Sequence, residues 1–157
     1  MNKIKYIFID IDGVLTDGTV QIDAHGNESK RICYHDLDAI GKGRRNGFDF
    51  AFITGEDTDM ARFITKRFNV SVGRFGAKDK LKAIQNLMEE LNVTREEICY
   101  IGDSERDIPA IQLAKIGAAP ADALDEVKKV ADVVLNHKGG EGALMELVSR
   151  LIEGKVK

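Results

Sequence analysis

The chain has 157 residues, of which 43% are hydrophobic and 31% are charged, so it is long and apolar enough to bury a globular core. Its 23 basic and 26 acidic residues give a net charge of −3, which argues against general nucleic-acid binding because such proteins usually present a basic face. No apolar run approaches the roughly 20 residues of a membrane span, and residues 1–20 lack the pattern of a secretory signal. We therefore expect a cytoplasmic protein whose partners include neither nucleic acid nor a membrane.

Apolar segments that alternate with helical patterns predict an α/β fold. We expect buried strands at residues 5–10, 48–54, 69–73, 97–103, 116–121 and 131–136. Helical spacing is clearest in residues 77–92, where apolar side chains form one stripe, and Thr94 with Glu97 has the pattern of a capping box. The alternation predicts a Rossmann-like parallel sheet with helices on both faces and right-handed connections.

Residues 19–34 interrupt this alternation. They read as two short strands around residues 24–27, which predicts a β-hairpin directly after the first strand and its acidic motif. The sequence contains no repeat, no low-complexity segment and no linker rich in Pro, Gly or Ser. We expect residues 1–157 to form a single domain.

Polar side chains follow the predicted strands at the point where each strand ends. In an open parallel sheet, ligands bind outside the carboxyl ends of the strands, so these side chains should converge on one small volume. Taken alone, each of them fits a helix cap, a turn or a solvated surface, and the ordered set carries the interpretation. At the strand ends we expect Asp10, Asp12, Thr54, Gly55 and Asp103. Asp107 follows about one helical turn after Asp103, and Lys80 opens a helix that begins near the same edge.

The gathered carboxylates indicate a hard divalent cation such as Mg²⁺. Carboxylates so close together raise one another's pKa unless a cation lies between them, and Mg²⁺ prefers oxygen ligands. A cation would keep Asp10 ionised, so that it could attack a phosphoryl group and form an aspartyl-phosphate. The side chain of Asp12, two residues on, lies on the same side of an extended strand and could protonate the departing alkoxide. Gly13 would let the backbone turn close to the ion.

Four short motifs resemble, in chain order, those of the haloacid dehalogenase superfamily. They read DIDGVLTDG, ITGE, KDK and IGDSERD. The segments DGTVQIDAHGNESK and GGEGALMELVSRLI are similar to its capless branch, in which a β-hairpin flap takes the place of a cap domain. The resemblance implies a Mg²⁺-dependent phosphatase that acts on a sugar-acid phosphate, either 3-deoxy-D-manno-octulosonate 8-phosphate or 2-keto-3-deoxy-nonulosonate 9-phosphate.

The resemblance also implies catalytic roles. Asp10 would be the nucleophile, and Asp12 would be the general acid and base. Thr54 and Lys80 would hold the phosphoryl oxygens, with Gly55 in the turn of Thr54. Lys78 is a rival to Lys80 for this role.

The same resemblance implies a metal site and an assembly. Asp10 and the backbone carbonyl of Asp12 would bind Mg²⁺, Asp103 would bind it directly or through water, and Asp107 would support the site. The hairpins of four chains would associate into a homotetramer, and the tail from Gly139 would approach a neighbouring active site.

Departures from the octulosonate-type pattern bear on the substrate. Glu56 stands where those members commonly carry arginine, and Glu141 and Met145 replace two further arginines. A carboxylate accepts hydrogen bonds from sugar hydroxyls, so Glu56 favours the nine-carbon acid, although an acid in the first turn of a helix is also stabilised by the helix dipole. His35 could contact the substrate or be an exposed loop histidine, and Arg67 is the cation available to Glu56.

Three alternatives remain at this point. The first is a phosphatase for another small phosphomonoester. The second is a signalling receiver domain, which also uses acids, a Thr and a Lys on a parallel sheet, but whose acceptor aspartate follows a later strand. The third is a non-catalytic regulatory or assembly domain of sugar-nucleotide synthesis.

Overall fold

The computed structural model describes residues 3–156; residues 1–2 and 157 lie outside the described part. Its main sheet has six strands in the order β5-β4-β1-β6-β7-β8, and every neighbouring pair is parallel. This is the strand order of a doubly wound Rossmann-type sheet. The strands are β1 (Tyr6–Ile9), β4 (Asp49–Ile53), β5 (Gly73–Arg74), β6 (Ile98–Ile101), β7 (Ile116–Ala119) and β8 (Val133–Val134).

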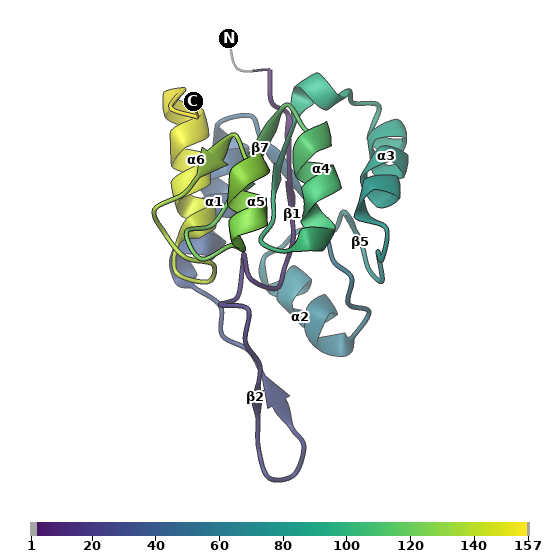
Figure 1. Cartoon of the computed structure of the whole chain (residues 1–157), viewed down its shortest axis with the longest axis vertical. Helices are drawn as coiled ribbons and strands as arrows, with labels where there is room; N and C mark the ends of the chain where they lie inside the picture. The colour runs from purple at the N-terminus through teal and green to yellow at the C-terminus, as the bar shows by residue number, and fades with distance from the viewer. Residues whose placement is uncertain (1–2, 157) are drawn as a thin grey trace.

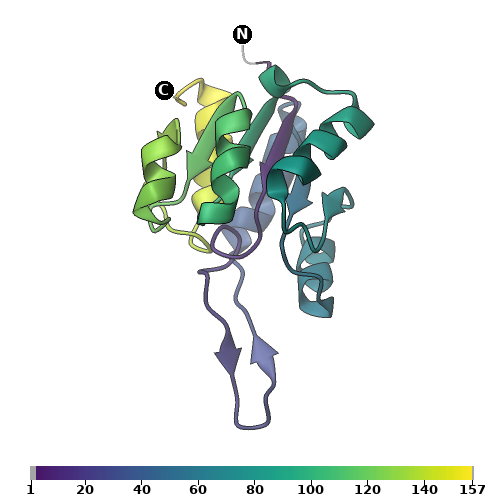
Figure 2. The same ribbon diagram turned by 45° about the vertical axis from the view of Figure 1, so that its right-hand side comes forward.

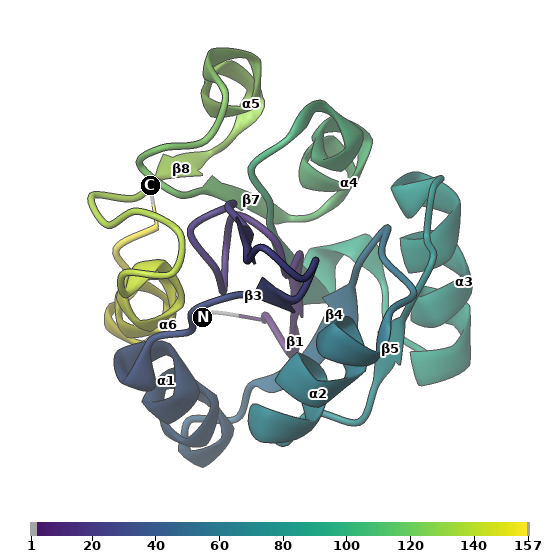
Figure 3. The same ribbon diagram turned by 90° about the horizontal axis from the view of Figure 1, so that it is seen from below.

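Helices cover both faces of this sheet, which confirms the predicted fold class (Figure 3). One face packs against α1 (Tyr34–Arg45), α2 (Asp59–Arg67) and α6 (Ala143–Glu153). The other face packs against α3 (Lys80–Leu91), α4 (Ile108–Leu113) and α5 (Asp125–Val130). Within residues 3–156, no helix combines the length and the apolar character that crossing a membrane requires.

The central strands are buried on both faces, and this explains their unbroken apolar runs. Their register places Ile9 of β1 opposite Phe52 of β4 and Ile101 of β6. The three strands therefore reach the carboxyl edge of the sheet at almost the same level. The polar residues that follow them in sequence are delivered to one place.

The hairpin projects from this edge, away from the sheet and its helices (Figures 1 and 2). As predicted, it pairs two short antiparallel strands, β2 (Gln21–Ile22) and β3 (Glu28–Ser29). The carboxylate of Asp23 closes the turn by accepting the backbone N–H groups of His25 (2.8 Å) and Asn27 (2.9 Å). Gly26 in this turn has a φ of 80°, which favours glycine.

All six strands are shorter than expected, and for two of them the difference has a clear physical reason. The strand expected at residues 69–73 is displaced to β5, because Asn69 takes a left-handed conformation (φ 56°) where α2 ends, and Val70 donates its N–H to Thr65. The strand expected to reach residue 121 ends before Pro120, which has no N–H to donate to the sheet. The capping box at Thr94 and Glu97 is present, but it opens a short 3₁₀ helix, η1 (Arg95–Glu97), directly before β6.

Candidate active site

A cleft of about 260 Å³ lies at the carboxyl edge of the sheet, beside the ends of β1, β4 and β6. From β1 the chain proceeds through β4 to β5 on one side, and then crosses to β6 on the other. This is the topological switch point, where open α/β sheets bind their ligands. Most of the predicted site residues line the cleft: Asp10, Asp12, Thr54, Gly55, Glu56, Lys80 and Asp103.

Lys80 connects two of the predicted carboxylates. It is the first residue of α3, whose N-cap is Asp79, and its side chain is only 4% exposed. Its ammonium nitrogen lies 2.8 Å from Oδ1 of Asp10 and 2.7 Å from Oδ1 of Asp107. A lysine is rarely buried unless it is paired, so this arrangement fixes the ammonium beside the end of β1.

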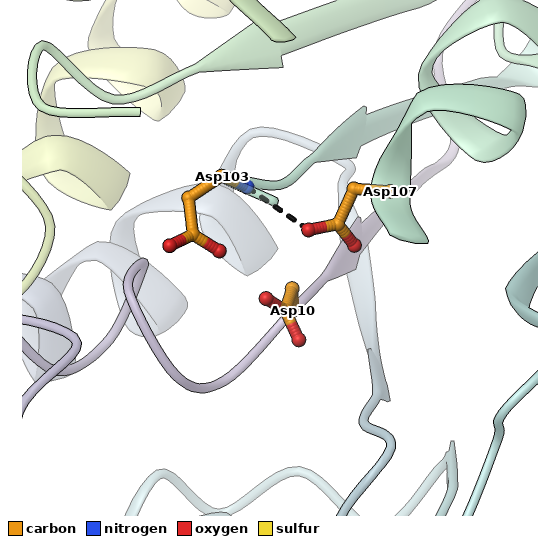
Figure 4. A group of neighbouring side chains, drawn as sticks. All are labelled: Asp10, Asp103 and Asp107. Carbon is orange, nitrogen blue, oxygen red and sulfur yellow. Dashed lines mark hydrogen bonds between the residues drawn. The ribbon is translucent and has the colours of Figure 1, made fainter. Parts of the chain in front are cut away.

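Asp107 is the most completely bonded carboxylate of the site. Besides Lys80, its Oδ1 accepts the hydroxyl of Tyr100 at 2.6 Å. Its Oδ2 accepts the backbone N–H groups of Asp103 (3.0 Å, Figure 4) and Ser104 (3.1 Å), and the hydroxyl of Ser104 at 3.2 Å. Because both oxygens are engaged, Asp107 holds its neighbours in place more than it offers a free ligand.

Asp103 faces Asp10 across the cleft. One carboxylate oxygen each from Asp10, Asp103 and Asp107 falls within a group in which all three atoms lie within 4.8 Å of one another (Figure 4). A Cβ at Gly13 would lie 1.8 Å from Oδ2 of Asp103, and Gly13 has a φ of 85°. Only glycine therefore allows the loop after β1 to pass beside this acid.

The electrostatics of the cluster favour a bound cation. Burial, and then the neighbouring charge of Asp107, raise the pKa of Asp10 well above its ordinary value, although Lys80 opposes both effects. Burial is also the main reason that the pKa of Asp103 is raised to about 6. Burial opposes charge on Lys80 too, but the two carboxylates outweigh it and raise the pKa of the ammonium. One ammonium cannot balance three carboxylates, and the oxygen donor set fits Mg²⁺.

Asp12 lies apart from this group. Its Oδ1 is 2.8 Å from the ammonium of Lys30, at the base of the hairpin, and Asp12 also lines the cleft. Nothing in the sequence pattern distinguishes Lys30 from a solvated hairpin lysine, and the pairing was not predicted. The metal-binding role of the Asp12 carbonyl stays a prediction.

The second motif supplies a hydroxyl and a turn. Thr54 is buried directly after β4, and its hydroxyl oxygen accepts the backbone N–H of Glu56 at 3.1 Å. The ammonium of Lys78 is exposed and donates to the Gly55 carbonyl at 2.9 Å. Of the two rival lysines, Lys80 is thus the one whose ammonium contacts Asp10.

The predicted substrate-binding residues divide into two groups. Glu56 is exposed at the cleft, next to Gly55. His35 is exposed in the first turn of α1, and Arg67 is exposed in the last turn of α2, 5.9 Å from the ring of Tyr34; neither lines the cleft. A role for His35 or Arg67 in substrate binding stays a prediction.

Sequence reasoning missed several residues of the site. Gly18, Ser104 and Arg106 line the cleft but match no expected role. Tyr100 carried one signal, because a tyrosine in a fully buried strand needs a partner for its hydroxyl. Outside the site, the contact of Asp36 was also missed: this acid is fully buried and accepts the backbone N–H of Met145 at 3.1 Å, at the start of α6.

The segment from Gly139 packs against the loop after β1 of its own chain. The N–H of Gly140 donates to the Val14 carbonyl at 2.8 Å, and a Cβ at Gly139 would lie 1.8 Å from the Gly13 carbonyl oxygen. These contacts support the loop that carries Asp12. An approach of this segment to a neighbouring active site stays a prediction.

The comparisons with known proteins agree with this geometry. A family model described as haloacid dehalogenase-like hydrolase matches residues 75–147. A 3-deoxy-D-manno-octulosonate 8-phosphate phosphatase of Haemophilus influenzae is 33% identical over 100% of this chain and 87% of its own length. The chain belongs to the haloacid dehalogenase-like hydrolase family.

Solved structures in this family superimpose on almost the whole chain. The cobalt-bound octulosonate 8-phosphate phosphatase of Haemophilus influenzae has a TM-score of 0.91 at 32% identity, covering 98% of this chain and 90% of that one. The enzyme of Moraxella catarrhalis, in complex with a magnesium ion, a phosphate ion and a KDO molecule, has a TM-score of 0.92 at 27% identity, covering 98% and 88%. Both support the classification of this chain as a phosphoric monoester hydrolase.

Proposed function

We propose that this protein is a Mg²⁺-dependent phosphatase that hydrolyses a sugar-acid phosphate through an aspartyl-phosphate on Asp10. The observation that carries the proposal is the position of Asp10: it is buried at the switch point, 2.8 Å from the Lys80 ammonium and within the cluster of three acids. The named relatives, which act on the phosphate of an eight-carbon sugar acid, supply the substrate class.

In the first step, a carboxylate oxygen of Asp10 forms a bond to phosphorus as the ester P–O bond breaks. Asp12 gives its proton to the departing sugar oxygen, so the sugar leaves as a neutral alcohol. In the second step, water attacks the same phosphorus, Asp12 takes a proton from that water, and the bond from phosphorus to Asp10 breaks. Lys80 and the Thr54 hydroxyl hold the phosphoryl oxygens through both steps.

Asp10, Asp103 and the backbone carbonyl of Asp12 would hold the Mg²⁺, with Asp107 fixing the backbone of Asp103 behind them. The bound ion supplies positive charge that keeps Asp10 ionised and attracts the phosphate. Asp107 and Tyr100 contribute by keeping Lys80 oriented toward Asp10.

We propose further that Glu56 directs the preference toward a nine-carbon acid. Among residues 3–156, Glu56 has no ion-pair partner, so its carboxylate is free to accept hydrogen bonds from substrate hydroxyls. The longer acid places one more hydroxyl-bearing carbon between its carboxylate and its phosphate. The named relatives make the eight-carbon 8-phosphate the competing substrate.

The test measures phosphate release from a panel of sugar-acid phosphates and sugar phosphates, with Mg²⁺ or with EDTA. The full chain should release phosphate only with the metal, and kcat/KM should favour the 9-phosphate over the 8-phosphate. Glu56→Arg should shift that ratio toward the 8-phosphate, whereas Glu105→Arg, a charge reversal at an exposed position outside the cleft lining, should not. A wild-type preference for the 8-phosphate, or an unchanged ratio in Glu56→Arg, overturns the assignment of Glu56 only.

We also propose a homotetramer assembled through the hairpins. The hairpin carries two exposed apolar side chains, Val20 (41%) and Ile22 (64%), and a two-stranded hairpin alone is only marginally stable in water. Pairing with neighbouring chains would cover these side chains and the strand edges. Light scattering at micromolar concentration should give the mass of four chains, and a fully active monomer contradicts the assembly.

A further inference from the structure

Lys30 differs from the rest of the hairpin in which it lies. Residues 18–29 are all exposed, whereas the side chain of Lys30, directly after β3, is only 14% exposed. Fixing a lysine side chain costs up to about 2 kcal/mol of conformational entropy, so a fixed lysine needs a strong partner. That partner is Asp12, whose Oδ1 lies 2.8 Å from the ammonium nitrogen.

The contacts of Asp12 are confined to one of its two oxygens. Oδ1 accepts the Lys30 ammonium and, at 3.5 Å, the hydroxyl of Thr16. Thr16 is itself fixed: it is fully buried, and its hydroxyl oxygen accepts the backbone N–H groups of Gly13 (3.2 Å) and Gly18 (3.3 Å). Among the residues that the structure describes, Oδ2 of Asp12 has no hydrogen-bond partner, and Asp12 lines the cleft.

We propose that Lys30 is a positioning residue for the general acid and base, which it holds by Oδ1 so that Oδ2 faces the scissile ester. The inference rests on the proposed function, because it assigns the proton transfer to Asp12. When Oδ2 gives its proton to the sugar oxygen, Asp12 regains a negative charge, and the ammonium at 2.8 Å stabilises that charge. Lys30 keeps its own protons throughout. The hairpin is too small to close over a substrate, but through Lys30 at its base it positions Asp12 for proton transfer.

The sharpest test compares esters whose leaving groups differ in their need for a proton. p-Nitrophenolate leaves readily without protonation, whereas the oxygen of an alkyl phosphate does not. Because kcat/KM reports the steps up to release of the alcohol, it isolates the first proton transfer from the later hydrolysis of the aspartyl-phosphate. The full chain is measured with Mg²⁺ on p-nitrophenyl phosphate, on phenyl phosphate and on the best alkyl phosphate of the panel.

Lys30→Met keeps the length of the side chain and removes the charge. It should lower kcat/KM about tenfold or more for the alkyl phosphate and less than about threefold for p-nitrophenyl phosphate. Lys30→Gln should behave in the same way, and Lys30→Arg, which keeps a cation, should recover part of the loss. The matched control is Arg31→Met, because Arg31 is the next residue, is 78% exposed and, among residues 3–156, forms an ion pair only with Asp17, at 3.4 Å. The control should match wild type on all three esters.

Two results would overturn the inference. One is a Lys30→Met variant that matches Arg31→Met on every ester. The other is an equal rise in KM on all three esters with kcat unchanged, which would make Lys30 a phosphate ligand instead. Light scattering and thermal melting of each variant separate these effects from altered assembly or folding. A wild-type protein that releases no phosphate from any ester would instead overturn the proposed function itself.

Discussion

The carboxyl edge of the sheet and the hairpin that projects from it differ in burial and in the number of contacts that hold their side chains. At the edge, Asp107 accepts five hydrogen bonds and Lys80 is 4% exposed between two carboxylates. On the hairpin, residues 18–29 are all exposed, and its strands pair over two residues each. The side chains at the edge are therefore held in place by several contacts within one chain. The hairpin has few contacts with the rest of its chain, so we expect its role to depend on Lys30 at its base and on contacts with neighbouring chains.

The largest expected effect on turnover comes from replacing Asp10, the proposed nucleophile at the edge. Asp10→Asn should lower kcat by about 10³-fold or more, because an amide is nearly isosteric with the carboxylate but a poor nucleophile. Phosphate release and circular dichroism are measured on the same sample, and the spectrum should match wild type. Asp12→Asn should lose about 10²- to 10⁴-fold. Near-normal turnover that needs Mg²⁺ in Asp10→Asn contradicts the covalent mechanism.

The rigidity of the edge can be broken at Asp107. Asp107→Asn should lower the free energy of unfolding by about 3 kcal/mol, because it removes a buried negative charge that accepts hydrogen bonds from Lys80, Tyr100 and two backbone N–H groups. Lys80 would retain its ion pair with Asp10. Tyr100→Phe removes one of these donors and should cost about 1.5 kcal/mol. Urea unfolding with an unchanged slope measures both. A value for Asp107→Asn within about 0.5 kcal/mol of wild type would show that this network does not stabilise the fold.

The pH dependence of stability should differ between the protein in EDTA and the protein with Mg²⁺. The pKa of Asp103 is raised to about 6 from an ordinary 3.8, and that of Asp10 is raised too, so the folded chain binds protons more tightly than the unfolded chain. In EDTA, these two acids should therefore stabilise the fold as pH falls through about 6, and that contribution should be lost as pH rises.

With Mg²⁺ the dependence should reverse, because protons compete with the ion for the same oxygens. The increase in melting temperature caused by Mg²⁺ should therefore shrink between about pH 7.5 and pH 5.5. Asp103→Asn is the control, since it removes one of the two titrating acids. An Mg²⁺ effect that is constant over this range would contradict the placement of the ion among these carboxylates.

The smallest effect on the fold is expected on the hairpin. Ile22→Asp should change the unfolding free energy of the separated chain by less than about 0.5 kcal/mol, because Ile22 is 64% exposed and packs against little of its own chain. It should nevertheless lower the mass measured by light scattering, because it places a charge on the surface that would join the hairpins. A variant that keeps the wild-type mass would show that Ile22 lies outside the interface.

The contrast between edge and hairpin also explains what the sequence could predict. The carboxyl ends of parallel strands converge, so Asp10, Thr54 and Asp103 could be placed together once a parallel sheet was predicted. The start of a helix at Lys80 was also predicted, and the structure places the ammonium of this lysine against Asp10. Local patterns of this kind are sufficient to place a residue when its position follows from the end of a strand or the start of a helix.

The contacts that were missed join segments far apart in sequence, or depend on a turn. Lys30 reaches Asp12 only because the hairpin folds back on its base, and Asp36 reaches the start of α6 across more than 100 residues. No periodicity signals either contact. The third strand begins later than expected because the chain makes a left-handed turn at Asn69, in a segment whose residues by propensity alone favour an extended conformation.

The most direct test of the central claim is to locate the phosphoryl group on the protein. Asp12→Asn, incubated with Mg²⁺ and phenyl phosphate, quenched in acid and mapped by mass spectrometry, should carry a phosphoryl adduct on Asp10. In wild type, the adduct should form and disappear with turnover. An adduct on another aspartate that persists in wild type without phosphate release would indicate a signalling receiver. Steady phosphate release with no adduct on Asp10 in either protein would contradict the nucleophilic role of Asp10.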